Sequence, residues 1–164
     1  MNIWKRVSLS VAVAVMALLL FTMTTAFAEG AGAVTFTQNV HNAVQSFPTP
    51  NPCTGAPATV TLTFNGVFHV TALTSGKGAG TFWATGTQTG DFVLAPDDST
   101  QPTYTGHFTT WFGDNNNLHN GVEGSTFTIH GVGSDGSTLD FHDVAHMSVN
   151  ANGVTFSFDK PTCG

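Results

Sequence analysis

The feature that most constrains the fold of this chain is the short spacing of its turn-forming residues. Clusters of Asn, Gly, Pro, Ser and Asp lie at 51–55, 65–66, 75–78, 95–98, 113–121, 134–136 and 152–153. The runs between them are rich in Val, Thr, Phe and Ile, and apolar and polar residues alternate along them, as in half-buried β-strands. No run repeats the apolar spacing of a helix. The sequence therefore predicts strands at 33–45, 58–64, 67–73, 80–94, 103–112, 123–132, 138–150 and 154–159.

Eight neighbouring strands predict an all-β domain with an antiparallel meander. Such a meander either closes into a barrel or folds into a β-sandwich. Closure removes the sheet edges, which charged side chains otherwise protect, and only 9% of the residues here are charged. We therefore expect a single eight-stranded barrel domain over residues 29–164, with the sandwich as the alternative.

The first 28 residues have the three parts of a secretory signal peptide. Lys5 and Arg6 precede an apolar run, and the small-x-small triplet at 26–28 precedes Glu29. The apolar run is shorter than the roughly 20 residues that a spanning helix needs. We expect cleavage before Glu29 and a secreted, extracellular protein that has no membrane association after signal removal.

Charge excludes one class of partner. After residue 28 only Lys77 and Lys160 face ten Asp and Glu residues. A nucleic-acid binder needs a basic stripe that displaces counterions from phosphates, and two lysines cannot form one. An anionic membrane surface is an equally poor partner. We expect no nucleic-acid partner.

Two cysteines, Cys53 and Cys163, both stand in loop-like contexts beside prolines. An even number of cysteines in an exported chain predicts a disulfide. This bond would attach the C-terminus to the loop after the first strand.

The register of the last three strands follows from two turns. A three-residue loop around Asp135-Gly136, with Gly136 in the left-handed region, pairs Gly133 with Ser137. Continuing this pairing sets Ile129 opposite Phe141, Phe127 opposite Asp143, His130 opposite Asp140 and Thr128 opposite His142. A turn at Asn152-Gly153 sets Met147 opposite Phe158, Val149 opposite Phe156 and His146 opposite Asp159. One face is then apolar: Phe127, Ile129, Leu139, Phe141, Ala145, Met147, Val149, Phe156 and Phe158.

Asp143 interrupts this apolar face at its middle. An unpaired carboxylate is costly to bury, so we expect Asp143 to be inward, largely buried and hydrogen-bonded. One interpretation is a structural bond to an inward polar group such as Tyr104. The other makes Asp143 the polar anchor of a small pocket lined by Tyr104, Phe108, Phe127 and Phe141, because ligand sites combine apolar walls with few polar groups.

Trp83 and Trp111 alternate out of phase with the core-like Phe82, Phe108 and Phe112, so both are predicted to point outward. Outward aromatic residues form an aromatic surface patch for a glycan or a partner protein, or they cover the wall of the domain.

Five segments carry a resemblance to a known group of proteins. They are 51–55 (Asn-Pro-Cys-Thr-Gly), 66–71, 105–113, 133–142 (with Ser-Asp-Gly-Ser-Thr-Leu-Asp-Phe-His) and 156–161 before the final cysteine. In these strings the chain resembles a group of exported bacterial all-β proteins to which no activity is assigned. The resemblance implies a secreted, disulfide-closed all-β domain and implies no reaction.

Candidate metal and catalytic motifs are weak. The chain has seven histidines, of which His130 and His142 could form a surface cluster with Asp140. The pattern favours ordinary cross-strand charge pairs instead, His130 with Asp140 and His146 with Asp159. Segment 114–121 departs from a calcium loop, because its glycine is at position eight rather than six. Gly-x-Ser-x-Gly, His-Glu-x-x-His and phosphate-loop motifs are absent. We expect no metal and no cofactor.

These observations favour a secreted non-catalytic binding module, which holds a small apolar ligand inside the barrel or presents an aromatic surface patch. One alternative is an enzyme that uses Asp143 with a histidine as acid and base. Another is a structural or adhesive component of the cell envelope, for which a filled interior is expected. The presence of an internal cavity, and the polar side chains that line it, would separate the three.

Overall fold

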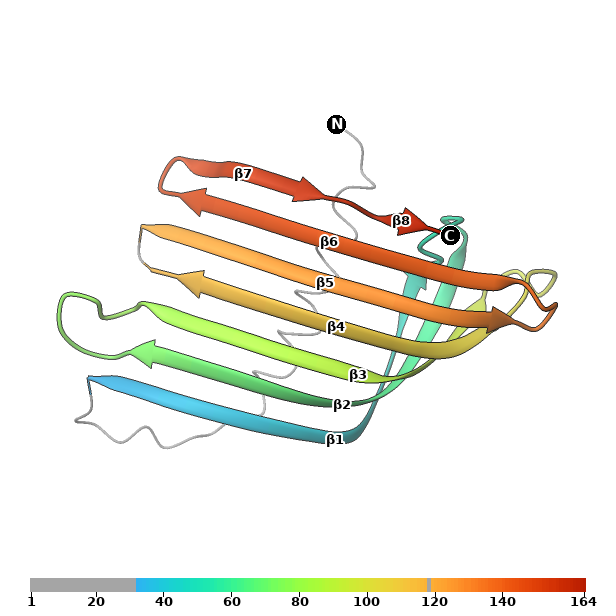
Figure 1. Ribbon diagram of the computed structural model, residues 1–164, viewed down its shortest axis with the longest axis horizontal. Coiled ribbons are helices and arrows are strands. Elements are labelled where there is room, and N and C mark those ends of the chain that lie inside the picture. Colours follow the sequence, from blue (N-terminus) through green and yellow to red (C-terminus); the bar gives the residue numbers. More distant parts are fainter. Residues whose placement is uncertain (1–31, 118) are drawn as a thin grey trace.

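The computed structural model describes residues 32–117 and 119–164, so the predicted signal peptide lies outside the described residues. All regular structure in these ranges is β. The strands are β1 (Ala33–Pro50), β2 (Pro57–Leu73), β3 (Phe82–Pro96), β4 (Tyr104–Asn116), β5 (Asn120–Gly133), β6 (Thr138–Asn150), β7 (Gly153–Asp159) and β8 (Thr162–Cys163) (Figure 1). Over the described ranges, no helix is long and apolar enough to span a membrane.

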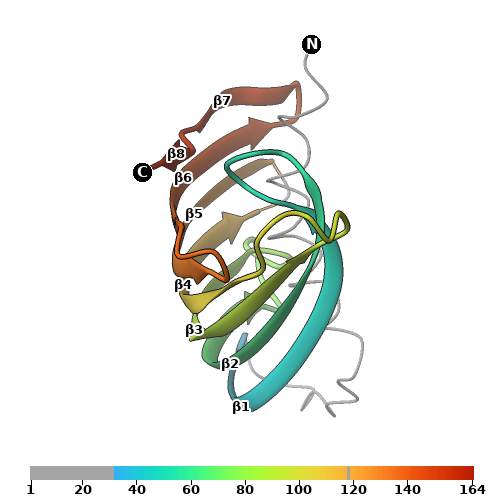
Figure 2. The ribbon, with the colours of Figure 1, turned by 90° about the vertical axis from the view of Figure 1, so that its right-hand side faces the viewer.

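The strands form one antiparallel meander that does not close into a barrel. The pairing order runs from β1 to β7, and β8 pairs with β6 beside β7. In the described chain β1 pairs only with β2, and β7 only with β6. The meander is confirmed, whereas the predicted closure is wrong. The sheet is instead a curved trough, in which β1 and β2 bend round to face the later strands (Figure 2).

A bulge in β1 accounts for part of this curvature. The β1–β2 register shifts between Val40 and Ala43, and Asn42 has a positive φ of 49°. Such a bulge bends a strand and increases its twist. The half of β1 after the bulge carries Ala43 and Phe47 against the core. This half therefore covers the concave face of the trough without pairing with β7.

Glycines let neighbouring strands approach closely where the sheet bends. A Cβ atom at Gly90 would lie 2.1 Å from the carbonyl oxygen of Thr63, and one at Gly106 would lie 2.0 Å from that of His130. No side chain fits at such distances, so these positions require glycine.

The core lies on the concave face towards one end of the trough. The buried apolar residues that pack together in this core are Ala58, Val60, Leu62, Phe64, Phe92, Leu94, Phe108, Ile129, Leu139 and Phe141. Phe64 and Phe108 are the most deeply buried large side chains, and their rings meet edge to face with centroids 6.4 Å apart. Strict alternation along each strand places these residues on one side of the sheet, as the sequence predicts.

The predicted turn at Asn65-Gly66 is wrong, because β2 runs through it as one strand. Asn65 pairs with Thr89 of β3, and Gly66 pairs with both Gln88 and Val40. The Oδ1 atom of Asn65 accepts a hydrogen bond of 3.1 Å from the backbone amide of Asn42 in the β1 bulge. These residues therefore support the bulge of the neighbouring strand and make no turn of their own.

The hairpin between β5 and β6 has the predicted register. The amide of Gly133 donates to the carbonyl of Ser137 at 2.7 Å, and Gly136 has a φ of 85°. Phe127 pairs with Asp143, and Ile129 pairs with Phe141.

Gly136→Ala tests the left-handed residue of this hairpin. No atom lies within 4 Å of a Cβ placed there, so the substitution measures backbone strain without a clash. We expect a loss of roughly 1–2 kcal/mol in the free energy of unfolding, measured by urea denaturation. Gly136→Asn, which tolerates this conformation better, should cost less. Equal costs for Ala and Asn would contradict the role assigned to φ.

The predicted register of β6 and β7 is wrong, because the two turn residues are Ala151 and Asn152, with Asn150 opposite Gly153, and because β7 contains a bulge. Val149 pairs with Val154, whereas Ser148 pairs with Phe156, so Thr155 is left without a partner in the ladder. Its hydroxyl donates to the carbonyl of Ser148 at 3.2 Å. As a result Asp159 lies opposite Ala145 and not opposite His146. Phe158 takes the place opposite His146, and Phe156 pairs with Ser148, so both phenylalanines leave the apolar face on which they were predicted.

Candidate functional site

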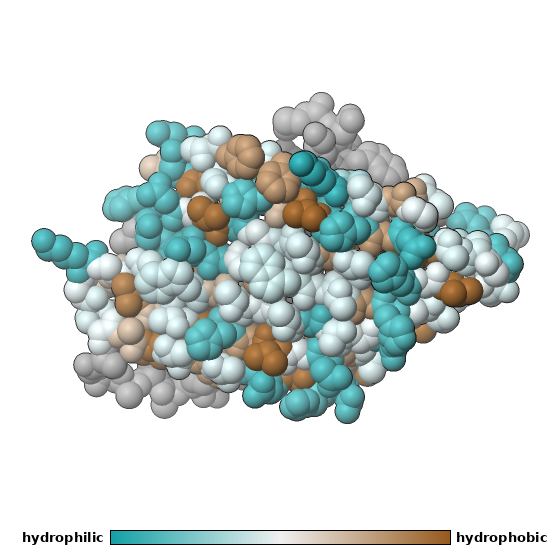
Figure 3. All heavy atoms as spheres, in the orientation of Figure 1, coloured by the Kyte–Doolittle hydropathy of each residue, from teal (hydrophilic) through white to brown (hydrophobic). Residues whose placement is uncertain are grey.

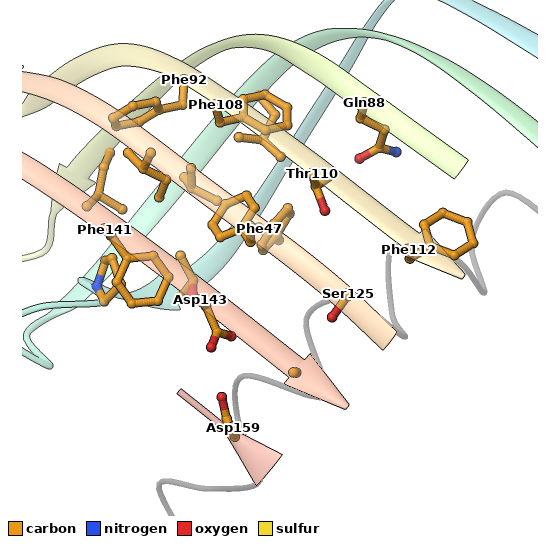
Figure 4. A pocket seen from close by; sticks show the side chains of 18 of the residues that line it. Phe47, Gln88, Phe92, Phe108, Thr110, Phe112, Ser125, Phe141, Asp143 and Asp159 are labelled. Atoms are coloured by element: carbon orange, nitrogen blue, oxygen red, sulfur yellow. The ribbon is translucent and has the colours of Figure 1, made fainter. Parts of the chain in front are cut away.

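A cavity of about 210 Å³ opens on the concave face of the trough (Figure 4). Its wall is mainly apolar and includes Phe47, Phe92, Phe108, Phe127 and Phe141. The polar groups on the wall are Gln88, Thr110, Ser125, Asp114, Glu123, Asp143 and Asp159, together with Thr49 at the end of β1. The concave side of the sheet is therefore hollow at this point, and polar side chains interrupt its mainly apolar wall.

Strand alternation positions the aromatic part of this wall. Phe108, Phe127 and Phe141 lie on β4, β5 and β6 at inward-facing positions. Neighbouring rings are in contact, with centroids 6.2 Å apart for Phe108–Phe127 and for Phe127–Phe141. These three predicted lining residues are brought together in one row across the sheet.

Tyr104, the fourth predicted lining residue, is not on the wall of this cavity. Its hydroxyl accepts a hydrogen bond of 3.1 Å from the hydroxyl of Ser137 in the β5–β6 turn. It borders a separate hollow beside the disulfide, together with Asn51 and Leu139. Tyr104 lies at the start of β4, four residues before Phe108, and this distance along the strand separates it from Asp143.

Asp143 faces the cavity from β6 and is only 9% exposed. Its Oδ1 atom has no hydrogen-bond partner in the described part of the chain. The carboxyl group of Asp159 on β7 lies beside it, and the two groups point towards one another (Figure 4). The expected inward, buried position is thus observed, while the expected hydrogen bonding is incomplete at one oxygen.

The environment of Asp143 disfavours its charge. Burial is the largest cause that raises the pKa of Asp143, and the adjacent carboxyl of Asp159 adds to it by sharing a proton and by its negative charge, so that the pKa reaches about 6. Hydrogen bonds from the backbone amides of Val144 and Lys160 oppose this shift. Asp143 therefore changes its ionisation close to neutral pH, where an ordinary aspartate is fully charged.

A second pair of carboxyl groups lies on the same concave face. Asp114 of β4 and Glu123 of β5 are directly opposite in the ladder. Burial raises the pKa of Asp114. Burial, and then the negative charge of Asp114, raise the pKa of Glu123. Two like charges at opposed positions destabilise a sheet, so this pair also disfavours full ionisation.

Sequence reasoning missed three of these four carboxylates. The sequence predicts a loop at Asp114, but β4 continues to Asn116 and keeps Asp114 in phase with Phe108 and Phe112. Extending the alternation past the predicted strand end would have found it. The sequence predicts that Glu123 begins a strand but does not predict the face on which it lies. It predicts Asp159 on the outer face, opposite His146, whereas Asp159 lies opposite Ala145 on the inner face.

The cavity wall contains no lysine, arginine or histidine in the described ranges. Lys160 follows Asp159, but its Nζ atom lies 5.3 Å above the ring of Phe158. The alternative of an enzyme that pairs Asp143 with a histidine therefore lacks its second residue.

The histidines most prominent in the sequence lie on the outer face. His130 and Asp140 form the predicted pair, with Nδ1 and Oδ1 2.7 Å apart. His146 does not pair with Asp159, and its ring contacts those of Phe156 and Phe158, each with centroids 5.7 Å apart. No group of three or more His, Cys, Asp or Glu residues in the described ranges is arranged to hold a metal ion.

Trp83 and Trp111 point outward, with exposed fractions of 40% and 44%. Trp83 pairs with Asn115, and Trp111 pairs with Thr87, so the two rings are offset by four residues, or about 13 Å, along the strands. Hydrophilic and intermediate residues cover most of this outer face, and hydrophobic residues are scattered on it (Figure 3). The two tryptophans therefore do not form one continuous patch.

Cys53 and Cys163 form a disulfide, which attaches β8 to the loop between β1 and β2. That loop is held by the side chain of Asn51, whose Oδ1 accepts hydrogen bonds from the amides of Cys53 and Thr54. Pro50 and Pro52, on either side of Asn51, are part of the cavity wall.

Comparison of the chain with protein-family models, with curated proteins and with solved structures finds no match.

Proposed function

We propose that this protein is a secreted, non-catalytic binding module that holds a small apolar ligand in the concave cavity. The observation that carries the proposal is an aromatic cavity whose wall contains one deeply buried carboxyl oxygen that has no hydrogen-bond partner among the described residues. Apolar walls with a few placed polar groups are typical of small-molecule sites, because the walls supply affinity and the polar groups orient the ligand. Asp143 is the anchor in this proposal.

The size of the cavity supports a small ligand. Its volume of about 210 Å³ is below the roughly 300–1,000 Å³ usual for drug-sized molecules. A structural or adhesive protein would be expected to fill its core to crystal-like density. The hollow therefore favours binding over a purely structural role.

The disulfide supports the proposed location. Cys53 and Cys163 are bonded, and structural disulfides are rare in reducing compartments. The resemblance of the chain to exported bacterial proteins supports the same location.

Titration with N-phenyl-1-naphthylamine, a neutral apolar fluorophore, tests the proposed function. We expect saturable binding with enhanced, blue-shifted emission from the disulfide-bonded protein. Ser125 lines the cavity, and its neighbour Thr126 does not. Ser125→Phe, which fills the cavity, should weaken binding about tenfold or more, whereas Thr126→Phe should change it about twofold or less.

Circular dichroism of both variants would show that each retains the fold. The absence of saturable binding, or an equal loss in both variants, would contradict the proposal.

A further inference from the structure

Binding an uncharged ligand would leave the electrostatics of the cavity unexplained. Four carboxyl groups face it, from Asp114, Glu123, Asp143 and Asp159 on β4 to β7. None of its described lining residues is cationic. Opposite charges usually accompany buried carboxylates, because an isolated charge is costly in a low-dielectric interior. The described chain supplies negative charge to this cavity and no positive charge.

The position of Asp143 points to where a positive group would bind. Asp143 is nine-tenths buried, and its Oδ1 atom lacks a donor in the described ranges. A buried acceptor without a donor destabilises the empty protein, so a donor supplied by a ligand gains more here than at an exposed site. Asp159 adds a second carboxyl group beside Asp143 (Figure 4).

Aromatic rings border this position as well. Phe127 is the direct cross-strand partner of Asp143, and Phe141 precedes it by two residues on the same face of β6. The faces of such rings attract ammonium groups, with a larger effect where water is excluded. A carboxyl pair beside two phenylalanines is thus suited to an organic cation.

A metal ion fits the same place poorly. Ca²⁺ takes six to eight oxygen ligands, and Mg²⁺ needs near-octahedral geometry. No group of three or more candidate ligands is arranged around a point in the described ranges. The other carboxyl pair is distant, because Glu123 lies opposite Met147, four residues beyond Asp143 on β6, which is about 13 Å along the strand.

We infer that the ligand of this cavity is an apolar amine, whose protonated nitrogen binds between Asp143 and Asp159 while its hydrocarbon part contacts the aromatic wall. This inference rests on the proposed function and specifies the class of its ligand. The ammonium group donates to Oδ1 of Asp143, and its charge offsets that of the carboxyl pair. Only the chemical class is assigned.

The cation also changes the ionisation of its partners. A bound ammonium favours the charged form of Asp143, so binding releases the proton that this group holds near its pKa of about 6. Asp159 from β7 faces the same position, and Asp114 and Glu123 face the cavity from β4 and β5. All four groups are acidic, so protonating any of them weakens attraction for the cation. Amine affinity should therefore fall as the pH is lowered from 7.5 to 5.

A matched set of eight-carbon ligands tests the inference. Octylammonium, octanol and octanoate are titrated against the protein with bound N-phenyl-1-naphthylamine, and affinities are confirmed by calorimetry. At pH 7.5 we expect octylammonium to bind about tenfold or more tightly than octanol, and octanoate to bind most weakly. Asp143→Asn should reduce the ratio of octylammonium affinity to octanol affinity to about twofold. Asp140→Asn, on the opposite face of β6, is the control and should keep the full advantage.

The outcomes separate the two proposals. Equal affinities for octylammonium and octanol would overturn the amine inference and leave the binding module intact. Failure of every apolar ligand to bind would overturn both. Competition by Ca²⁺ at micromolar concentration would replace the amine with a metal ion, and an unchanged amine advantage in Asp143→Asn would overturn the assigned anchor.

Discussion

Replacing Cys53 and Cys163 with serine is expected to lower the free energy of unfolding by about 4–5 kcal/mol. The bonded residues are separated by 110 positions, so the bond restricts most of the domain in its unfolded state. Loss of the bond also frees both of its ends in the folded state. β8 pairs with β6 at two positions, Phe141–Cys163 and His142–Thr162, with one further backbone hydrogen bond from Gly164 to Asp140. The loop after β1 carries Pro50 and Pro52 of the cavity wall.

Guanidinium denaturation of the double serine variant measures this loss directly. The wild-type protein in excess reductant is the matched control and should unfold at the same denaturant concentration as the variant. A loss below about 1 kcal/mol, within the range of ordinary surface substitutions, would show that the sheet holds its two ends without the bond.

Asp143→Asn is expected to stabilise the protein at pH 7.5 and to have little effect below pH 4. The pKa of Asp143 is about 6 in the folded protein, above its ordinary value of 3.8. The folded state therefore binds the proton more tightly than the unfolded state does. Its contribution to stability is complete below about pH 4 and is lost as the pH rises through about 6. From the size of the pKa shift, the loss amounts to roughly 2–3 kcal/mol. An asparagine carries no charge at any pH and avoids this loss.

Urea denaturation of both proteins between pH 3.5 and 8 measures the contribution of Asp143 together with its interaction with Asp159, because the carboxyl groups elsewhere are common to both proteins. The difference in unfolding free energy should grow between pH 4 and 6 and stay constant above about pH 7. A variant less stable than the wild type at pH 7.5 would contradict the prediction, since it would mean that the charged form of Asp143 is stabilised inside the protein.

The parts of the fold that the sequence predicts correctly depend on local geometry. The register of β5 and β6 follows from one glycine turn and from alternation on both sides of it. The same alternation correctly assigns Phe108 to the interior and both tryptophans to the exterior. Each of these features is decided by residues within a few positions of a turn.

The parts that the sequence does not predict depend on distant strands. Asn65-Gly66 has the composition of a tight turn, yet its pairing with β3 and with β1 beside the bulge keeps β2 one continuous strand through it. Closure of a barrel depends on whether the first and last strands meet, which in turn depends on bends at Asn42 and at internal glycines such as Gly90. A local signal cannot decide between these outcomes, because the competing contacts come from elsewhere in the chain.

The candidate site was predicted in part for the same reason. Asp143 was found because it breaks an apolar alternation within a single strand. The charge beside it was missed, since Asp159 reaches the cavity only through the bulge at Thr155. The residue type of Asp159 gives no indication of the face of β7 on which it lies.

The bulge at Thr155 affects how the cavity wall changes when related chains gain or lose a residue in this hairpin. Pairing of β7 without it would turn Phe158 towards the cavity and Asp159 towards solvent, since a shift of one residue exchanges the two faces of a strand. Retaining the bulge while one residue is inserted or deleted before Asp159 would have the same effect. The chemistry of the cavity at β7 therefore depends on whether the length of this hairpin is odd or even. Two chains with the same residues at every aligned position, but with hairpins that differ by one residue, would present a carboxylate in one case and an aromatic wall in the other.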